Sequence, residues 1–300
     1  MTVERKYDLY SREMKADPFP IFAAMRRDDP IFVQLGLDGH TLIWFATRHA
    51  DVEKILTDEG HFQRDGRAHG IISDFPDPLV GELVENHMLN RDGDDHRRLR
   101  SLVSKAFTPK RVRDMRPRIQ QITDDLINKV IDKGEMELVA EFAFPLTITV
   151  IQEMLGIPPG DHERFRRWSN AVLAPAVEPG SQRVMLATLA EFVAYLQALF
   201  VERQNNPAGD LVSALIHAEE GGDRLTEGEL LGMMMLLIIA GHETTVNLIS
   251  NALVALWQHQ DQLALLQADP GLMPAAIEEF VRFGAPVERG FNRFLAVKKE

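Results

Sequence analysis

The sequence predicts a mainly α fold with a small β element. Nearly all of the chain after residue 95 has the pattern of helices, and two short apolar runs flank Asp38-Gly39 near the N-terminus. Strands do not alternate with helices, which argues against a doubly wound sheet. The 300 residues, 45% of them hydrophobic, are enough for a sizeable core in one large domain or two small ones.

Composition narrows the class of protein. The formal net charge of −12 argues against a general nucleic-acid binder, and the absence of cysteine excludes disulfides and thiolate ligands from these residues. The N-terminus is charged and has no apolar targeting segment. The most apolar run, Leu230 to Ala240, is far shorter than the roughly 20 residues that span a bilayer. We therefore expect a cytoplasmic protein that binds neither membrane nor nucleic acid.

The N-terminal region contains the β element. Asp17-Pro18 predicts the start of a helix that ends near Asp29-Pro30, because an N-cap residue followed by proline is a typical helix start. Residues 31–36 and 41–45 are apolar runs on either side of a turn signal, so they predict a β-hairpin.

Two further elements complete the first ninety residues. Thr47 is expected to cap a helix that carries Val52, Ile55 and Leu56. Residues 60–90 contain scattered Gly, Pro, Asp and His, so we expect a long loop with one short helix. Loops of this length inside a compact domain are often functional.

The rest of the chain is predicted to be helical, with breaks at glycine and proline. The expected helices span residues 95–107, 109–132, 141–156, 160–173, 181–204, 209–218, 226–257, 259–267 and 274–283.

The helix over residues 226–257 carries unusual residues at its middle. Thr226 and Glu229 predict a capping box, and about 30 helical residues give a length of roughly 45 Å. The helix is apolar on all sides before residue 240, so we expect it to be buried. Gly241 would leave space beside the backbone, and Thr244 would bond to the carbonyl of Ala240.

Glu243 adds an ionisable group next to that gap, and a buried carboxylate is costly unless it is paired or used. These residues predict the wall of a pocket with a proton donor, a hydroxyl and room for a small ligand. A helix kink with a satisfied polar pair explains the same residues, and the sequence leaves both interpretations open.

Residues 88–112 contain a second candidate site. His96 and Arg100 are four residues apart and share a helix face, where two cationic donors can hold a carboxylate or phosphate. A solvated, charged helix is the alternative. Residues 97–118 contain nine Lys or Arg and one acid, Asp114, and we call them the basic patch. The patch predicts a docking surface for an acidic protein partner.

The third stretch lies near the C-terminal end. Glu279 and Arg282 are three residues apart and are expected to form an ion pair on one helix. Arg289 and Arg293 follow after Pro286 has ended that helix.

Together these stretches resemble the cytochromes P450, the haem-thiolate monooxygenases, from residue 17 onward. AGHETT (240–245) is similar to the oxygen-activating motif of that family, DDHRRLR (94–100) to its haem-contacting helix, and EFVR (279–282) to its Glu-x-x-Arg motif. PVERGFNRFLA (286–296) is similar to the strand that follows, and residues 210–245 resemble the soluble bacterial members.

The resemblance implies a cytochrome P450 fold, a haem b cofactor and a role for each motif. Thr244 and Glu243 would be catalytic, as the hydroxyl and the acid of a proton relay. His96, Arg100 and Arg293 would bind the haem propionates, and Ala240 and Gly241 would border the haem and leave space for dioxygen. Glu279 and Arg282 would form a buried structural pair.

The resemblance also implies partners. The substrate would be a small, largely apolar organic molecule that is hydroxylated or epoxidised. It would be selected by the 62–90 loop, by residues 168–195 and by Met233, Met234, Leu237 and Ile238, although core packing explains the methionines equally well. The basic patch would dock a ferredoxin-type electron donor.

One departure from the family pattern is large. The chain ends at Val297-Lys298-Lys299-Glu300 without the Gly-rich loop and its iron-binding cysteine. We therefore expect a single domain over residues 1–300 that lacks this segment, with no metal ligand in the chain and a cysteine ligand beyond residue 300. A truncated copy is favoured over a natural short form. His242 is a weaker substitute ligand, because it lies on the distal helix.

Two other functions fit parts of the sequence. A non-catalytic protein that binds a hydrophobic ligand is favoured only by the absence of cysteine. A helical metallohydrolase with Asp94, Asp95, His96, His242 and Glu243 as ligands is disfavoured, because their spacing matches no metal motif.

Overall fold

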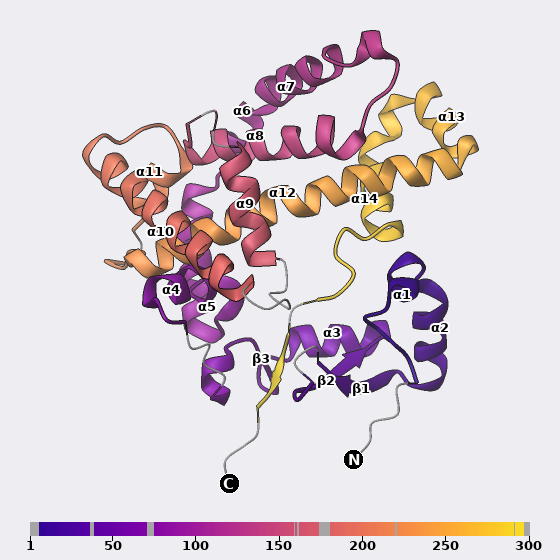
Figure 1. Cartoon of the computed structure of the whole chain (residues 1–300), viewed down its shortest axis with the longest axis horizontal. Coiled ribbons are helices and arrows are strands. Elements are labelled where there is room, and N and C mark those ends of the chain that lie inside the picture. Colours follow the sequence, from indigo (N-terminus) through magenta and orange to yellow (C-terminus); the bar gives the residue numbers. More distant parts are fainter. Residues whose placement is uncertain are drawn as a thin grey trace. The chain divides into compact units, whose positions relative to one another are not determined.

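The computed structural model describes residues 6–36, 39–70, 75–158, 160, 162–173, 181–219, 221–290 and 292–296 (Figure 1). The chain divides into two compact units. Unit 1 comprises Met1–His69 and Arg293–Glu300, and unit 2 comprises Gly70–Asn292. We describe each unit by itself, and the predicted single domain over residues 1–300 stays a prediction.

Unit 1 contains the small β element. Its elements are α1 (Arg12–Ala16), α2 (Phe19–Asp28), β1 (Ile31–Leu35), β2 (Leu42–Ala46), α3 (His49–Thr57), β3 (Phe62–Gln63), the 3₁₀ turn η1 (Gly66–His69) and β4 (Phe294–Leu295). β1 and β2 form the predicted antiparallel hairpin, with Val33 opposite Trp44. Of its turn, Leu37 and Asp38 lie outside the described residues.

The core of unit 1 lies between the hairpin and the first helices. Leu9, Met14, Met25 and Phe32 are buried together. Alternation along β1 turns Phe32 inward while Ile31 and Leu35 stay exposed. A second antiparallel pair joins β3 to β4, and the amide of Ala296 donates to the carbonyl of His61 at 2.7 Å.

The prediction that Thr47 caps a helix is wrong. α3 begins at His49, and its N-cap residue, Arg48, makes no side-chain cap. The hydroxyl of Thr47 donates instead to the carbonyl of Pro30 at 3.2 Å, and the Thr47 amide donates to the same carbonyl. Thr47 therefore ties the end of β2 to the start of β1.

The 60–90 segment contains more structure than the predicted loop. It holds β3, η1, α4 (Pro78–Glu85) and the 3₁₀ turn η2 (Met88–Asn90), while residues 71–74 lie outside the described part of the chain. Asp77 caps α4 by accepting a hydrogen bond from the amide of Leu79.

Unit 2 is helical, as predicted. After α4 and η2 it contains α5 (Gly93–Ala106), α6 (Pro109–Asp114), α7 (Arg116–Asn128), η3 (Ile131–Lys133), a π-helical turn η4 (Leu138–Ala143), α8 (Phe144–Leu155), α9 (His162–Leu173), α10 (Ser181–Asn205), α11 (Leu211–Ile216), α12 (Glu227–Gln258), α13 (Gln260–Ala268), η5 (Pro270–Leu272) and α14 (Met273–Phe283). The predicted 109–132 helix is divided near Met115.

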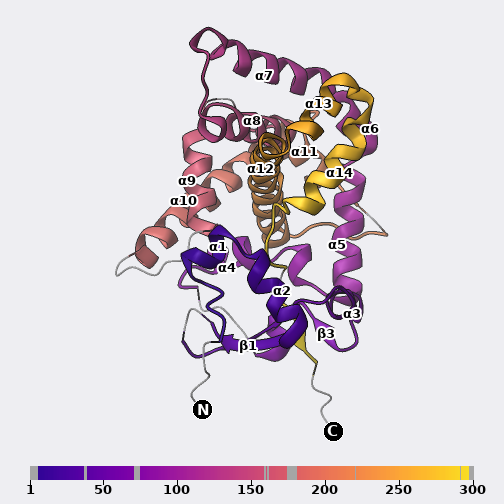
Figure 2. The same ribbon diagram turned by 90° about the vertical axis from the view of Figure 1, so that its right-hand side faces the viewer.

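α12 is the central helix of unit 2, and Figure 2 views it almost along its axis. Its capping box is confirmed, because Thr226 accepts from the amide of Glu229 and the Glu229 carboxylate accepts from the amide of Thr226. Its first half is buried from Glu229 to Leu236, as predicted. α8, η4 and α4 are among its main neighbours.

A partly buried ion pair joins α5 to the first turn of α12. Arg98 donates to the carboxylate of Glu229. Burial raises the pKa of Glu229, but the hydrogen bonds from Arg98 and from the Thr226 amide outweigh it, so the net pKa lies below its usual value. The carboxylate therefore serves as a cap for α12 and as an anchor for α5.

Two glycines let other helices approach α12 closely. A Cβ on Gly232 would collide with the backbone carbonyl of Asn86, at the end of α4. A Cβ on Gly241 would lie 2.9 Å from Cδ1 of Ile151 on α8. These positions need glycine because of contacts between helices rather than because of backbone conformation.

Three stretches are long and apolar enough to cross a membrane by length and composition: Leu138–Leu155, Ser181–Asn205 and Glu227–Gln258. All three contribute to the hydrophobic core of unit 2, through residues such as Ile148, Leu196 and Leu231. Between 33% and 44% of each apolar window is buried, so burial in this core accounts for part of their apolar character.

A polar junction fixes the end of α8. Gly156 has φ +75°, and a Cβ there would collide with the carboxylate of Asp210. Arg203 donates to Asp210 at 2.5 Å and to the carbonyl of Gly156 at 2.6 Å. Asp210 also caps α11 by accepting from the amide of Ser213. The junction therefore joins α8, α10 and α11.

Gly156→Ala is expected to destabilise the chain more than Gly134→Ala. Both glycines have positive φ, so alanine costs about 1–2 kcal/mol at either position. Only at Gly156 must Asp210 also move, which weakens its bonds and adds about 1–3 kcal/mol. Denaturant unfolding measures both losses, and equal losses would contradict this account of the junction.

Gly241→Ala is expected to destabilise the chain by about 1 kcal/mol, because crowding of Ile151 exceeds the gain in helix propensity. In an Ile151→Val background, which lacks the crowded Cδ1 atom, the same substitution is expected to be neutral or stabilising. A double-mutant cycle of unfolding free energies tests this. Additive effects would show that Ile151 does not limit the space beside Gly241.

Candidate functional site

The second half of α12 has an open side and a closed side. Ile238, His242 and Val246 are buried, whereas Ala240 is exposed. Thr244 is half-buried, and its hydroxyl donates to the carbonyl of Ala240 at 2.7 Å, as predicted. Ala240 and Thr244 thus lie one turn apart on a side of α12 that the described residues leave partly open.

The structure gives Gly241 a role that differs from the predicted open space. The direction in which its side chain would point is filled by Ile151 of α8. The glycine therefore serves close packing of α8 against α12. That Gly241 also borders the cofactor stays a prediction.

Glu243 lies between the two sides of α12. Its side chain is 46% exposed, and Oε2 lies 3.8 Å from Nε2 of His242, whose side chain is 2% exposed. Nδ1 of His242 bonds to the carbonyl of Ile238 at 2.7 Å. The acid is thus free to turn, and its histidine neighbour is fixed.

On α5, His96 and Arg100 share a helix face, as predicted. Nδ1 of His96 bonds to the carbonyl of Met88 at 2.7 Å, which fixes the ring. Arg100 is exposed, and no ion pair to it is found among the described residues. A fixed imidazole and an available guanidinium one turn apart suit an anionic group.

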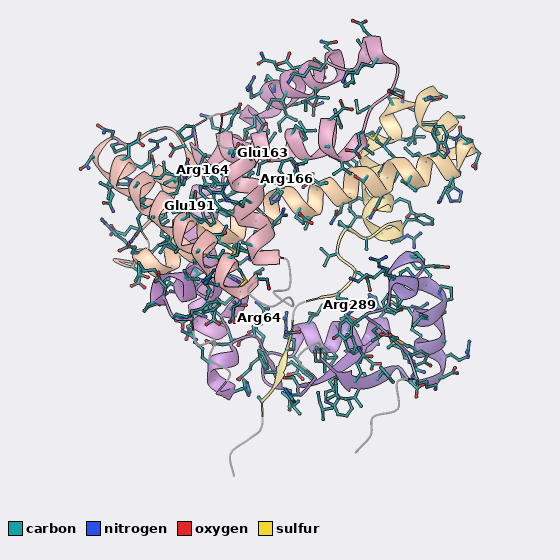
Figure 3. All side chains as sticks on the ribbon, viewed as in Figure 1. Arg64, Glu163, Arg164, Arg166, Glu191 and Arg289 are labelled. Carbon is teal, nitrogen blue, oxygen red and sulfur yellow. The ribbon has the colours of Figure 1, made fainter. Side chains whose placement is uncertain are left out.

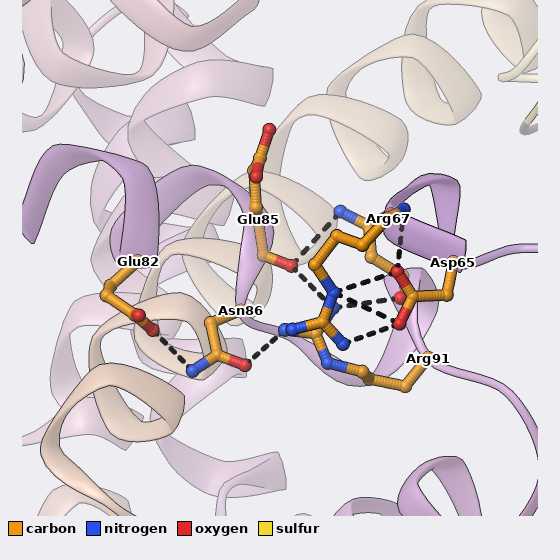
Figure 4. A network of polar contacts seen from close by, with 7 residues as sticks. Asp65, Arg67, Glu82, Glu85, Asn86 and Arg91 are labelled. Atoms are coloured by element: carbon orange, nitrogen blue, oxygen red, sulfur yellow. Dashed lines mark hydrogen bonds and ion pairs between the residues drawn. The ribbon is translucent and has the colours of Figure 1, made fainter. Parts of the chain in front are cut away.

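The connection that orients His96 is held by its own hydrogen bonds (Figure 4). Glu82 accepts from Asn86 at 2.5 Å, and the amide oxygen of Asn86 accepts from Arg91 at 2.5 Å. Arg91 also donates to the carbonyl of Glu85 at 3.4 Å. This chain of contacts joins α4 to the residues just before α5.

His87 belongs to the same connection and was not predicted from the sequence. It is buried, and burial together with the nearby Arg91 lowers the pKa of His87 to about 4. The imidazole is therefore neutral near pH 7. A single histidine in a predicted loop gives no sequence signal that it will be buried and neutral.

Arg293, the third predicted propionate ligand, lies in unit 1. It immediately precedes β4 and has interactions of its own. Because His96 and Arg100 lie in unit 2, the prediction that all three bind one cofactor stays a prediction. In unit 1, Arg67 forms a bidentate pair with Asp65, also drawn in Figure 4.

The four predicted substrate residues divide into two groups. Met233, Met234 and Ile238 are fully buried in the hydrophobic core of unit 2. Core packing, the alternative weighed for the methionines, therefore accounts for these three. Leu237 is half-buried and packs only against the edge of the core, so Leu237 remains the substrate candidate on α12.

Glu279 and Arg282 form the predicted ion pair, with a bidentate contact at 2.6 and 2.7 Å, and Arg282 lowers the pKa of Glu279. The expectation that the pair is buried is wrong, since the side chains are 55% and 69% exposed. The physical reason is that α14 buries none of its residues, so even Ile277 and Val281 are more than 40% exposed.

The basic patch contains paired and unpaired cations. Arg97 pairs with Asp94, Arg98 with Glu229, and Arg118 with Glu153. Among the described residues no ion pair is found for four cations on α6 and the start of α7: Lys110, Arg111, Arg113 and Arg116. Arg116 also lines a groove with Val112, Ile119, Gln120 and Thr123.

No group of three or more His, Asp or Glu residues able to hold a metal ion occurs in the described part of the chain. The metallohydrolase hypothesis therefore has no site in these residues. The two cations of α5 have the charge that a dianionic cofactor requires. That they bind such a cofactor together with the open side of α12 stays a prediction.

Comparison with family models of proteins finds no match. Comparison with curated proteins nevertheless finds closely similar sequences. The chain is 41% identical over 298 residues to a cytochrome P450 of Bacillus subtilis, covering 99% of the chain and 72% of that protein. It is 46% identical to cytochrome P450 CYP107DY1 of Priestia megaterium, with 82% of the chain and 62% of the relative covered. The chain thus spans less than two thirds of that relative.

Solved structures give the same result. The polyketide synthase cytochrome P450 PksS of Bacillus subtilis matches with a TM-score of 0.85 at 34% identity, over 94% of this chain and 70% of that one. P450BioI, solved with a fatty-acyl carrier protein, matches with a TM-score of 0.82 at 30% identity, over 95% and 76%. The predicted fold is confirmed, and the chain belongs to the cytochrome P450 family.

Proposed function

We propose that this chain provides the α12 and α5 faces of the haem site of a monooxygenase. Cytochromes P450 carry haem b, in agreement with the predicted cofactor. The observation that carries the proposal is the placement of the motifs. Ala240 and Thr244 share the open side of α12, while His96 and Arg100 share a face of an α5 helix that Arg98 anchors to α12.

The residues present fit the cofactor by their chemistry. His96 and Arg100 would bind propionates, while Nδ1 of His96 keeps its bond to the carbonyl of Met88. Arg293 of unit 1 is the proposed third donor. When bound, the haem supplies the oxygen chemistry, and Glu243 with Thr244 would hold and move protons beside it.

The iron-binding thiolate cannot come from these 300 residues, which contain no cysteine. The substrate would be a small, largely apolar organic molecule, with Leu237 at its boundary. Relatives include a vitamin D(3) 25-hydroxylase of Pseudonocardia autotrophica and a myxobacterial P450 solved with myristic acid. We place the protein in the bacterial cytoplasm.

Haem binding by the chain tests the cofactor proposal. Arg100→Ala is expected to weaken binding by about 10–100-fold, because a charge-assisted hydrogen bond contributes roughly 1.5–3 kcal/mol. Arg97→Ala is the matched control, since Arg97 lies on the same helix but pairs with Asp94. Titration followed by Soret absorbance gives both affinities.

Equal affinities of the Arg100 variant and the unmodified chain would contradict the proposed site. A spectrum under carbon monoxide adds a second criterion, because the chain alone should lack the strongly red-shifted band of thiolate-ligated haem. Binding of apolar ligands without any haem binding would favour the non-catalytic alternative.

The basic patch would dock a ferredoxin-type electron donor. Arg97, Arg98 and Arg118 of the patch pair with acids outside it, Lys105 donates to the carbonyl of Glu219, and Arg100 is assigned to the propionates. The proposed contact with the ferredoxin is therefore the four cations of α6 and α7 named above. Charge reversal at Lys110 and Arg113 is expected to slow association with an acidic ferredoxin and to reduce its salt dependence. Reversal at Arg118, which pairs with Glu153, should have a smaller effect. Equal effects would place the docking surface elsewhere.

A further inference from the structure

His242 is a buried polar residue on the closed side of α12. Its side chain is 2% exposed, and its ring meets the ring of Phe144 edge-on, with centroids 5.9 Å apart and an interplanar angle of 83°. Arg166 of α9 (Figure 3) lies over the ring of Phe144, 5.4 Å from its centroid. Packing from α8 thus fixes the plane of the imidazole.

The hydrogen bond of His242 determines which ring nitrogen faces the site. A carbonyl oxygen only accepts, so Nδ1 of His242 must carry the proton that bonds to Ile238 at 2.7 Å. In the neutral ring this leaves Nε2 as the acceptor, and Nε2 is the atom 3.8 Å from the Glu243 carboxyl. The acceptor therefore points toward the acid of the Gly-His-Glu-Thr-Thr motif.

We propose that His242 is a positioning residue for Glu243. Its Nε2 and the Glu243 carboxyl share one proton in a hydrogen bond that forms after a small rotation of the half-exposed Glu243 side chain, and this bond holds the carboxyl on the closed side of α12. The inference rests on the proposed function of Glu243, because it assigns a resting position to the acid of the proton relay.

The geometry of α12 allows the Glu243 side chain to move between His242 and Thr244. Successive residues of a helix are about 100° apart, so Glu243 lies between the direction of His242 and that of Thr244. One side-chain rotation exchanges the two neighbours. The carboxyl can then take a proton from its place beside His242 to the open side, where Thr244 and Ala240 lie, without any backbone movement.

Nitrogen NMR of the 300-residue chain, without haem, tests the pairing. In ¹⁵N-histidine-labelled protein, His242 is expected to show the fixed Nδ1–H tautomer, and His242→Phe assigns its signals. Glu243→Gln is expected to shift the Nε2 resonance of His242. The signals of His259, which meets Phe283 edge-on at the end of the same helix, should not change.

Rescue by a conservative variant separates positioning from packing. The amide of Gln reaches the position of Nε2, whereas Phe keeps only the bulk. The carboxyl ¹³C resonance of Glu243 is expected to move toward that of an exposed glutamate in His242→Phe and to stay near its original value in His242→Gln. His259→Phe is the control that should leave it unchanged.

The proposal is overturned if His242 carries its proton on Nε2, if Glu243→Gln leaves the Nε2 resonance in place, or if the Phe and Gln variants affect Glu243 equally. Since none of these measurements involves haem, they remain informative if the chain does not bind the cofactor. Loss of haem binding would contradict the proposed function alone.

Discussion

The buried first half of α12 is the constraint on which unit 2 depends. Glu229 closes the capping box of this helix and also binds Arg98, so the same carboxylate starts α12 and holds α5. Gly232 and Gly241 let the end of α4 and Ile151 of α8 approach the helix closely. The Arg98–Glu229 ion pair and the two glycines therefore set the distances among α4, α5, α8 and α12.

The same constraint orients the cations of α5. Arg98 is directed to the first turn of α12, and His96 and Arg100 lie two residues to either side of it in sequence. Two residues correspond to about 200° around a helix, so His96 and Arg100 share a face that points away from the Arg98 contact. The bond between Arg98 and the buried carboxylate of Glu229 therefore turns His96 and Arg100 to the opposite face of α5.

Prediction from the sequence was most successful where the signal is local. The capping box of α12, the bond from Thr244 to Ala240 and the hairpin depend on residues close in sequence, and the structure contains all three. Predictions that depend on distant partners were less successful. Thr47 bonds to Pro30 rather than capping α3, and Glu279 and Arg282 are exposed because nothing in the described residues covers α14.

The interior of α12 explains why the motif itself could be predicted but its surroundings could not. Four polar side chains of this helix bond to a backbone carbonyl four residues earlier: His242, Thr244, Thr245 and Ser250. Such bonds need no partner from another element, so polar residues are tolerated in an otherwise apolar helix. Which of these side chains faces the open side depends on where α8 packs against α12. That packing involves Ile151, which lies beside Gly241 but far from it in sequence.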